Sequence, residues 1–215
     1  MEVILLSNVR LSFPHIAEPQ KRIDPKTGKE RSSYSADFIM APDHPGYAQF
    51  MKRVSELALL RWKEHASQVM QMITAERKQR CYGDGNQKVK SKTFQPYDGY
   101  AGQVFITAHN DIAPQIIQAD GSPIDLQNTM AYQALTRKMY GGCRVNAAIK
   151  PWLQDNQHGR GVRCDLVAVQ FAGDDQPFGE GAVDVSGMFG QVQQAAPTAA
   201  PAPAFMMPVP PFMGQ

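Results

Sequence analysis

The chain has 215 residues, of which 43% are hydrophobic and 20% are charged. This composition is ordinary for a chain that buries one globular core, and the length does not demand a second core. No apolar run approaches the ~18 residues of a membrane-spanning helix. The first ten residues, MEVILLSNVR, have an acid at the second position and only four strongly apolar residues in a row, which argues against a secretory signal.

The charge is unevenly distributed along the chain. All 22 Lys and Arg residues lie at or before Arg163, together with 15 of the 20 acidic residues, so residues 1–163 carry a net charge of +7 and residues 164–215 carry −5. A basic body followed by an acidic segment indicates interaction with nucleic acid. The three cysteines are widely spaced without a CxxC motif, so we expect free buried thiols in a reducing compartment, without disulfides or a zinc site.

The first half of the chain predicts strands followed by a helical region. Strands are expected at 3–13 and 33–41, joined by a polar connection at 20–32. Asp43 can cap a helix that has Pro45 in its first turn. Apolar residues then recur at steps of three and four as far as Ile73, so residues 45–80 form one long helix or two shorter ones.

The second half predicts mainly strands. They are expected at 87–94, 102–110, 114–118, 141–152 and 161–171, separated by turn residues. Asp120 and Gly121 mark a hairpin-like turn, and residues 126–135 can form a short helix.

From residue 172 the composition changes. An acidic, Gly-rich stretch comes first, and residues 197–215 then contain six prolines and no charge. Such a segment cannot bury enough apolar surface to offset its ordering entropy. We therefore predict a folded domain over 1–171 and a mostly disordered, flexible tail over 172–215.

Catalytic motifs are missing from the sequence. The five histidines are scattered without metal-ligand spacing, and there is no nucleophile elbow or phosphate-binding loop. Asp174 and Asp175 are adjacent carboxylates, but they stand at the start of the predicted tail, where a metal site would be poorly preorganised. We predict no catalytic residues, no metal and no cofactor.

The stretch QKVKSKTFQPYDGY, residues 87–100, is the first candidate binding site. On a strand, Lys88, Lys90, Lys92 and Phe94 would share one face, because alternate residues point the same way. Two tyrosines, Tyr97 and Tyr100, follow on a Pro/Gly turn. Lysines along a phosphate backbone beside rings that stack on bases are typical of proteins that bind single strands. The alternative is a solvated, Lys-rich edge strand that prevents aggregation.

A second basic and aromatic group lies in YGGCRVNAAIKPW, residues 140–152. Arg144 and Lys150 would share a strand face, and Tyr140 and Trp152 flank them. Trp152 can be a stacking platform or a core residue. Further positive charge lies in the 20–32 connection, where a solubilising loop is the simpler interpretation; its basic residues are Lys21, Arg22, Lys26, Lys29 and Arg31.

Several segments resemble a family of tailed-phage single-stranded DNA-binding proteins, similar to the replication SSBs of podophages. They are NVRLSFPHIAEP (8–19), YSADFIMAPDHP (34–45) and YGGCRVNAAIKPW with GRGVRCDLVAVQF (140–152 and 159–171). The most specific part is GCxVNA followed by GxGV and LxAVQF, and the likeness covers about residues 3–180.

The resemblance implies a mainly β chain with an OB-fold, a five-stranded Greek-key barrel, here elaborated by a long helix and an extra hairpin. It implies a protein of the host cell cytoplasm that uses basic and aromatic residues on strands and loops to bind single-stranded DNA. The matching positions are Lys88, Lys90, Lys92, Phe94, Tyr97, Tyr100, Arg144 and Lys150, to which we add Trp152.

In the wider SSB world, an acidic tail with a terminal aromatic recruits replication proteins and competes for the DNA site. DDQPF (174–178) resembles such a tip but is internal, whereas the last residues are apolar and uncharged. The candidate residues for a partner-binding tail are Asp174, Asp175, Phe178, Phe205 and Phe212. A plain disordered tail is the alternative for both segments.

We therefore expect a non-catalytic protein that coats and protects single-stranded DNA during phage DNA replication and recombination. The alternatives are a module that recruits replication or recombination proteins through its tail, and a metal-dependent nuclease. No membrane partner is expected. Monomer and dimer both remain open.

Overall fold

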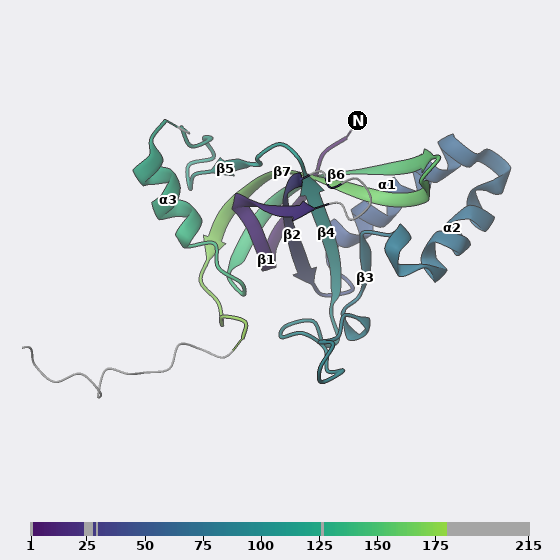
Figure 1. Ribbon diagram of the computed structural model, residues 1–215, viewed down its shortest axis with the longest axis horizontal. Coiled ribbons are helices and arrows are strands. Elements are labelled where there is room, and N and C mark those ends of the chain that lie inside the picture. The colour runs from purple at the N-terminus through teal and green to yellow at the C-terminus, as the bar shows by residue number, and fades with distance from the viewer. Residues whose placement is uncertain (1, 24–27, 29, 126, 180–215) are drawn as a thin grey trace, which may run out of the picture. The chain divides into compact units, whose positions relative to one another are not determined.

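The computed structural model describes residues 2–23, 28, 30–125 and 127–179. Five strands form a closed barrel (Figure 1): β1 (Ile4–Ile23), β2 (Glu30–Met40), β4 (Val104–Asn110), β6 (Arg144–Asn156) and β7 (Gly159–Gly173). Around the ring the order is β4, β2, β1, β6, β7, and a parallel pairing of β7 with β4, through Asp165 and His109, closes it. Every other pairing in the ring is antiparallel. The predicted five-stranded OB-fold barrel is thus confirmed.

Side-chain alternation explains how these strands enclose a core. On β6, Val145, Ala147 and Ile149 are fully buried, while the residues between them are only partly covered. On β1 the alternation shifts between Leu6 and Val9, which are both buried, because Asn8 has a φ of 55° at a register shift. Such bulges bend a strand around a barrel.

The helical region is two helices rather than one. The helix α1 (Pro45–Trp62) is followed by a short 3₁₀ turn (Lys63–His65) and α2 (Ala66–Ala75), and Lys63, with a φ of 50°, interrupts the run. The expected apolar stripe is buried along both helices, from Phe50 to Ile73. Pro45 occupies the first turn as predicted.

The predicted cap of this helix is wrong by one residue. His44, not Asp43, precedes α1, and its Nδ1 accepts a hydrogen bond of 3.1 Å from the Gly46 amide. The other ring nitrogen lies 3.0 Å from the carbonyl oxygen of Ser7. An imidazole can therefore hold the helix start against β1, which the shorter Asp43 side chain does not do.

Two short strands and a third helix complete the described fold. The strand β3 (Tyr82–Asp84) pairs with β4, and β5 (Gln115–Ile117) pairs with β7. The helix α3 (Thr129–Arg137) is the short helix predicted at 126–135. Figure 1 shows α1 and α2 at one end of the barrel and α3 at the other. None of the helices in the described residues is long and apolar enough to cross a membrane.

Three sequence predictions need correction. Residues 87–94 do not form a strand: after a 3₁₀ turn (Gly85–Gln87) they fold into a tight loop, with the Lys90 amide donating to Gln95 and the Tyr97 amide to Lys88. The segment has only two apolar residues, Val89 and Phe94, and Phe94 is exposed, so little apolar surface holds it on the core. The strand β3 was not predicted, and most of the 20–32 connection is strand, because β1 continues to Ile23 and β2 begins at Glu30.

The cysteines and the chain beyond the barrel follow the prediction in part. Cys81, Cys143 and Cys164 are free and buried, as expected, and burial raises the pKa of the Cys143 thiol to about 12. The expected boundary at residue 172 falls inside β7, and residues 174–179 contact the barrel. Residues 180–215 lie outside the described chain.

Candidate nucleic-acid interface

The long loop between β3 and β4, residues 85–103, is fastened to the barrel by a buried carboxylate. Asp37, on β2, is 3% exposed and accepts hydrogen bonds from Lys88 Nζ, from the Tyr100 hydroxyl and, at 2.6 Å, from Thr107 Oγ1. A buried carboxylate requires this number of donors, since its charge is otherwise costly. We call Asp37, Lys88, Tyr100 and Thr107 the loop anchor.

Aromatic rings surround the cation of the loop anchor. The Lys88 ammonium lies 4.6 Å from the centroid of Phe105 and 5.3 Å from those of Phe13 and Tyr100. Tyr100 is fully buried, and burial, followed by the adjacent Asp37 carboxylate, raises the pKa of its hydroxyl. The sequence placed Lys88 and Tyr100 among the candidate DNA-binding residues, but both side chains point into the protein and hold the loop in place.

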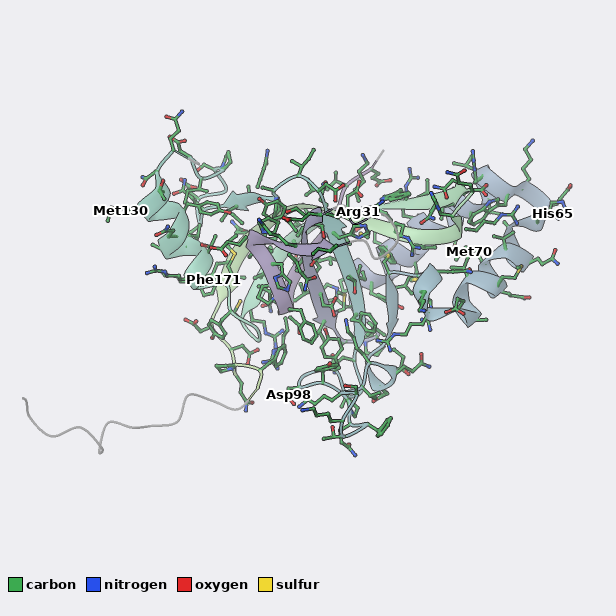
Figure 2. All side chains as sticks on the ribbon, in the orientation of Figure 1. Arg31, His65, Met70, Asp98, Met130 and Phe171 are labelled. Carbon is green, nitrogen blue, oxygen red and sulfur yellow. The ribbon has the colours of Figure 1, made fainter. Side chains whose placement is uncertain are left out.

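The other predicted residues of this segment lie on the outer part of the loop. Lys90 Nζ donates to Asp98 Oδ1 at 2.9 Å, and Figure 2 labels Asp98 in the loop that projects from the barrel. The hydrogen bond from Lys90, and then that from the Gly179 amide, lower the pKa of Asp98. Lys92 is exposed, and Phe94 is 77% exposed with a φ of 57°. An exposed ring beside lysines is suited to base stacking.

Tyr97 and Phe13 line the space between this loop and β1. Tyr97 is half-buried, and its ring meets that of Phe13 edge-on, with centroids 5.1 Å apart. Phe13 is 44% exposed and has a φ of 46° at the second register shift of β1, which turns it toward the loop. A cleft of about 390 Å³ lies here, with Lys90, Asp98 and Phe178 also in its wall.

Two arginines stand directly opposite each other where β1 pairs with β6. Arg10 and Arg144 are register partners, a placement that destabilises a strand pair unless an anion lies between them. The Asp175 carboxylate supplies that anion: its Oδ2 is 2.6 Å from Arg144 Nε and 3.6 Å from Arg10 Nε. We call Arg10 and Arg144 the arginine clamp.

Residues 174–179, which we call the strap, lie across the arginine clamp. The Phe178 ring is 4.3 Å from the Arg10 guanidinium, its amide donates to the Gly141 carbonyl, and its edge fills the place where a Cβ on Gly99 would stand. Asp174 accepts from the Tyr140 hydroxyl at 3.1 Å. The Gln176 amide, and then Arg144, lower the pKa of Asp175.

A second cleft, of about 580 Å³, lies on the other side of the clamp. Both arginines line it, together with Asn8, His44 and Gln103. The two clefts and the strap between them form a cationic and aromatic surface, which we call the interface groove. Sequence reasoning had placed Arg144 here but missed Arg10 and Phe13; both lie in the NVRLSF motif, where a strand face cannot be read because two bulges interrupt the alternation.

Lys150 and Trp152 lie elsewhere. Lys150 shares the outer face of β6 with Arg144, as predicted, and Trp152 follows on the same face. They lie six and eight residues farther along, or about 20 Å and more on strand geometry. Trp152 is half-buried and donates to Asp165 Oδ1 at 2.7 Å. With Leu57, Leu60 and Arg61 these residues line a separate cleft of about 690 Å³. Phe205 and Phe212 fall outside the described residues.

The fold and the groove together define an OB-fold protein whose cations and rings converge on one surface. Comparisons with known proteins give the family. A family model described as "Enterobacter phage Enc34, ssDNA-binding protein" matches residues 1–197. The chain therefore belongs to the Enc34 phage ssDNA-binding protein family.

Individual relatives and solved structures are similar to most of the chain. "Putative protein p50" of Acyrthosiphon pisum secondary endosymbiont phage 1 is 29% identical over 182 residues, covering 84% of this chain and 88% of that protein. The solved single-stranded DNA-binding protein from bacteriophage Enc34 is 25% identical, with a TM-score of 0.59 over 86% of this chain and 88% of the other. Its structure in complex with ssDNA superposes with a TM-score of 0.60 at 23% identity, over 82% and 89% of the two chains.

Proposed function

We propose that this chain is a non-catalytic protein that binds single-stranded DNA and coats it during phage DNA replication and recombination, in the host cell cytoplasm. The observation that carries the proposal is the family match, which extends over residues 1–197. The solved Enc34 complex with ssDNA supports it at the level of the family. Of the described residues, no three His, Cys, Asp or Glu side chains gather in a way that could hold a metal ion.

The interface groove is the surface we assign to DNA. The arginine clamp holds a carboxylate between two guanidiniums, an arrangement that also suits a phosphate oxygen. Tyr97 and Phe94 on the loop and Phe13 on β1 supply rings, of which Tyr97 is the least exposed and Phe94 the most exposed. Each base stacked on such a ring contributes about 1–3 kcal/mol. Lys90 and Lys92, on the same loop, can contact the phosphates of the DNA backbone between the clamp and the stacked bases.

Two pairs of the residues predicted from the sequence to bind DNA have other roles in this proposal. Lys88 and Tyr100 act indirectly, by holding the loop that carries Lys90, Lys92 and Phe94. Lys150 and Trp152 would bind a strand only after it has left the groove, because a separate cleft contains them.

Fluorescence titration with single-stranded oligothymidylate tests the proposal, because a base that stacks on Tyr97 quenches the emission of that tyrosine. Equal-length duplex DNA and RNA, each at two salt concentrations, define the preference for the single strand. We expect saturable binding to the single strand that weakens as salt rises. A lack of saturable binding at low salt would contradict the proposed function, and cleavage of a labelled strand with magnesium or manganese would favour a nuclease instead.

The strap supports a second role, recruitment of replication or recombination proteins. Asp174, Asp175 and Phe178 are engaged with the barrel, so a DNA strand that takes the clamp would release them, and Phe205 and Phe212 lie farther along the same tail. Removing residues 174–215 separates the two roles. A DNA-binding protein keeps or gains oligonucleotide affinity, whereas a protein that acts only as a recruiter loses its activity.

A further inference from the structure

A group of four cations lies outside the interface groove, where the 3₁₀ turn η2 (Arg77–Gln79) meets β7. Its members are Arg77, Lys78, Arg80 and Arg163. The main chain joins the two segments, since Arg80 forms a bridge with Val162. Arg163 Nη1 donates to the Lys78 carbonyl at 3.1 Å. We call these four residues the arginine corner.

Neutral acceptors orient the guanidiniums of the arginine corner. Arg77 donates to the Gln87 carbonyl and Arg80 to the Gln87 side chain, both at 3.3 Å. Arg163 Nε donates to Gln154 Oε1 at 2.9 Å. Amide oxygens fix the direction of a guanidinium without cancelling its charge, and each guanidinium has five N–H donors, so several remain available.

Carboxylates do not neutralise this group. Within the described residues, no acid lies at ion-pair distance from any of the four, whereas Arg10, Arg53, Arg61, Arg144 and Arg160 each have such a partner. The nearest acids in sequence have other partners: Glu76 accepts from the Lys78 amide and Asp84 from the Asn86 amide. Asp165, two residues after Arg163, accepts from the Trp152 ring. Arg77 and Lys78 are exposed, and Arg80 Nε is buried without a partner.

The loop anchor lies between the arginine corner and the interface groove. Gln87 accepts from the arginines of the corner, and the next residue, Lys88, reaches Asp37 beneath the groove loop. The ring of Phe105 approaches both Gly83, next to Arg80, and the Lys88 ammonium. The first residues of the 85–103 loop therefore contact the arginine corner through Gln87 and the loop anchor beneath the groove through Lys88.

We propose that the arginine corner is a second contact for the phosphodiester backbone, reached by a single strand that continues past the interface groove. This inference rests on the proposed function. Fixed guanidiniums that retain their charge suit phosphate oxygens, and a set of like charges held together gains most from a polyanion. The corner offers no open aromatic platform, so it would bind backbone without selecting bases.

The test compares oligothymidylates of about 6 and about 24 nucleotides, near the lower end and beyond the upper end of the ~4–16 nucleotides that OB folds cover. The variant is Arg77→Gln/Lys78→Gln, which changes two exposed side chains, and the control is Lys52→Gln/Lys138→Gln, which removes the same charge from exposed positions on α1 and from the end of α3. For the long strand, the slope of log K against log salt should become shallower by about 1.4, since each phosphate contact on a single strand contributes about 0.7.

The short strand separates the outcomes. We expect its salt slope to be the same in the variant, the control and the unaltered chain. An unchanged slope for the long strand would overturn the second contact while the proposed function stands, and so would equal changes for both lengths, which would place the corner within the groove itself. If the unaltered chain binds neither oligonucleotide, the proposed function fails and this inference fails with it.

Discussion

Two aspartates, one on a barrel strand and one on the strap, show how differently one kind of contact can act. Asp37 and Asp175 each accept hydrogen bonds from more than one group and each pair with a basic side chain. Asp37 is 3% exposed and lies beneath a loop. The Asp175 side chain keeps 28% of its exposure and lies on the strap, outside the barrel.

The difference in burial separates a structural ion pair from an exchangeable one. Breaking a buried pair leaves a charge without solvent or partner, so Lys88 cannot leave Asp37 to bind DNA without a large loss of stability. A pair at the surface contributes little, because water and salt can replace either partner. The arginine clamp can therefore exchange Asp175 for another anion, and the loop anchor cannot exchange Asp37.

The strongest test of this contrast is Asp37→Ala. It leaves the Lys88 ammonium, the Tyr100 hydroxyl and the Thr107 hydroxyl without their acceptor, and we expect the free energy of unfolding to fall by about 3–5 kcal/mol. Urea denaturation followed by far-UV circular dichroism measures it. The control is Asp98→Ala, which removes the half-exposed partner of Lys90 and should lower stability by at most about 1 kcal/mol. Similar losses in both variants would erase the distinction.

Tyr100→Phe should have the next largest effect. It removes the hydroxyl that donates to Asp37 but keeps the ring packing, and a hydrogen bond to a charged group contributes about 1.5–3 kcal/mol. The loss stays below that of Asp37→Ala because Lys88 and Thr107 still donate to the carboxylate. Tyr82→Phe is the matched control: Tyr82 is also buried, but its hydroxyl donates to no acceptor in the described part of the chain. It should change stability by about 0.5 kcal/mol or less.

The barrel could be predicted because its signals are local. The alternation of β6, the apolar stripe of α1 and α2 and the turn residues between strands each depend on neighbouring residues, and the family resemblance implied the five-stranded barrel. The ring closure through His109 and Asp165 has no local signature. Neither do the bulges at Asn8 and Phe13, which change the face that β1 presents.

The interface groove was harder to predict because it depends on pairs distant in sequence. Lys88 was expected on one strand face with Lys90 and Lys92, but Asp37, 51 residues earlier, turns it inward. Arg144 was expected beside Lys150, but its nearest cation is Arg10, 134 positions away in the register of β1 and β6. The strap lies in the segment that was predicted to be mostly disordered. Instead, Phe178 packs against Gly99, and Asp175 contacts both Arg10 and Arg144.

Arg144→Gln should weaken binding of single-stranded DNA with little change in stability. If the clamp contacts one phosphate through Arg144, the slope of log K against log salt becomes shallower by about 0.7, which corresponds to about fivefold weaker binding at about 0.1 M salt. Fluorescence titration over a range of salt concentrations measures the slope. Lys138→Gln, at the end of α3, is the control of equal charge. A slope that matches the control would remove Arg144 from the DNA path.

The smallest effect expected is that of Asp175→Asn. The substitution keeps the size of the side chain but removes the charge that competes with a phosphate at the arginine clamp, so single-stranded DNA should bind about two- to threefold more tightly, the scale of one surface ion pair. The pKa of Asp175 is lowered in the bound strap, so the carboxylate stabilises strap binding above the ordinary carboxyl range and loses that effect as the pH falls through the lowered pKa. The advantage of the variant should therefore hold at neutral pH and vanish in acid, as long as circular dichroism shows both proteins folded. Equal affinities at neutral pH would mean that Asp175 does not oppose DNA, and the strap would then leave the clamp without cost or remain beside a bound strand.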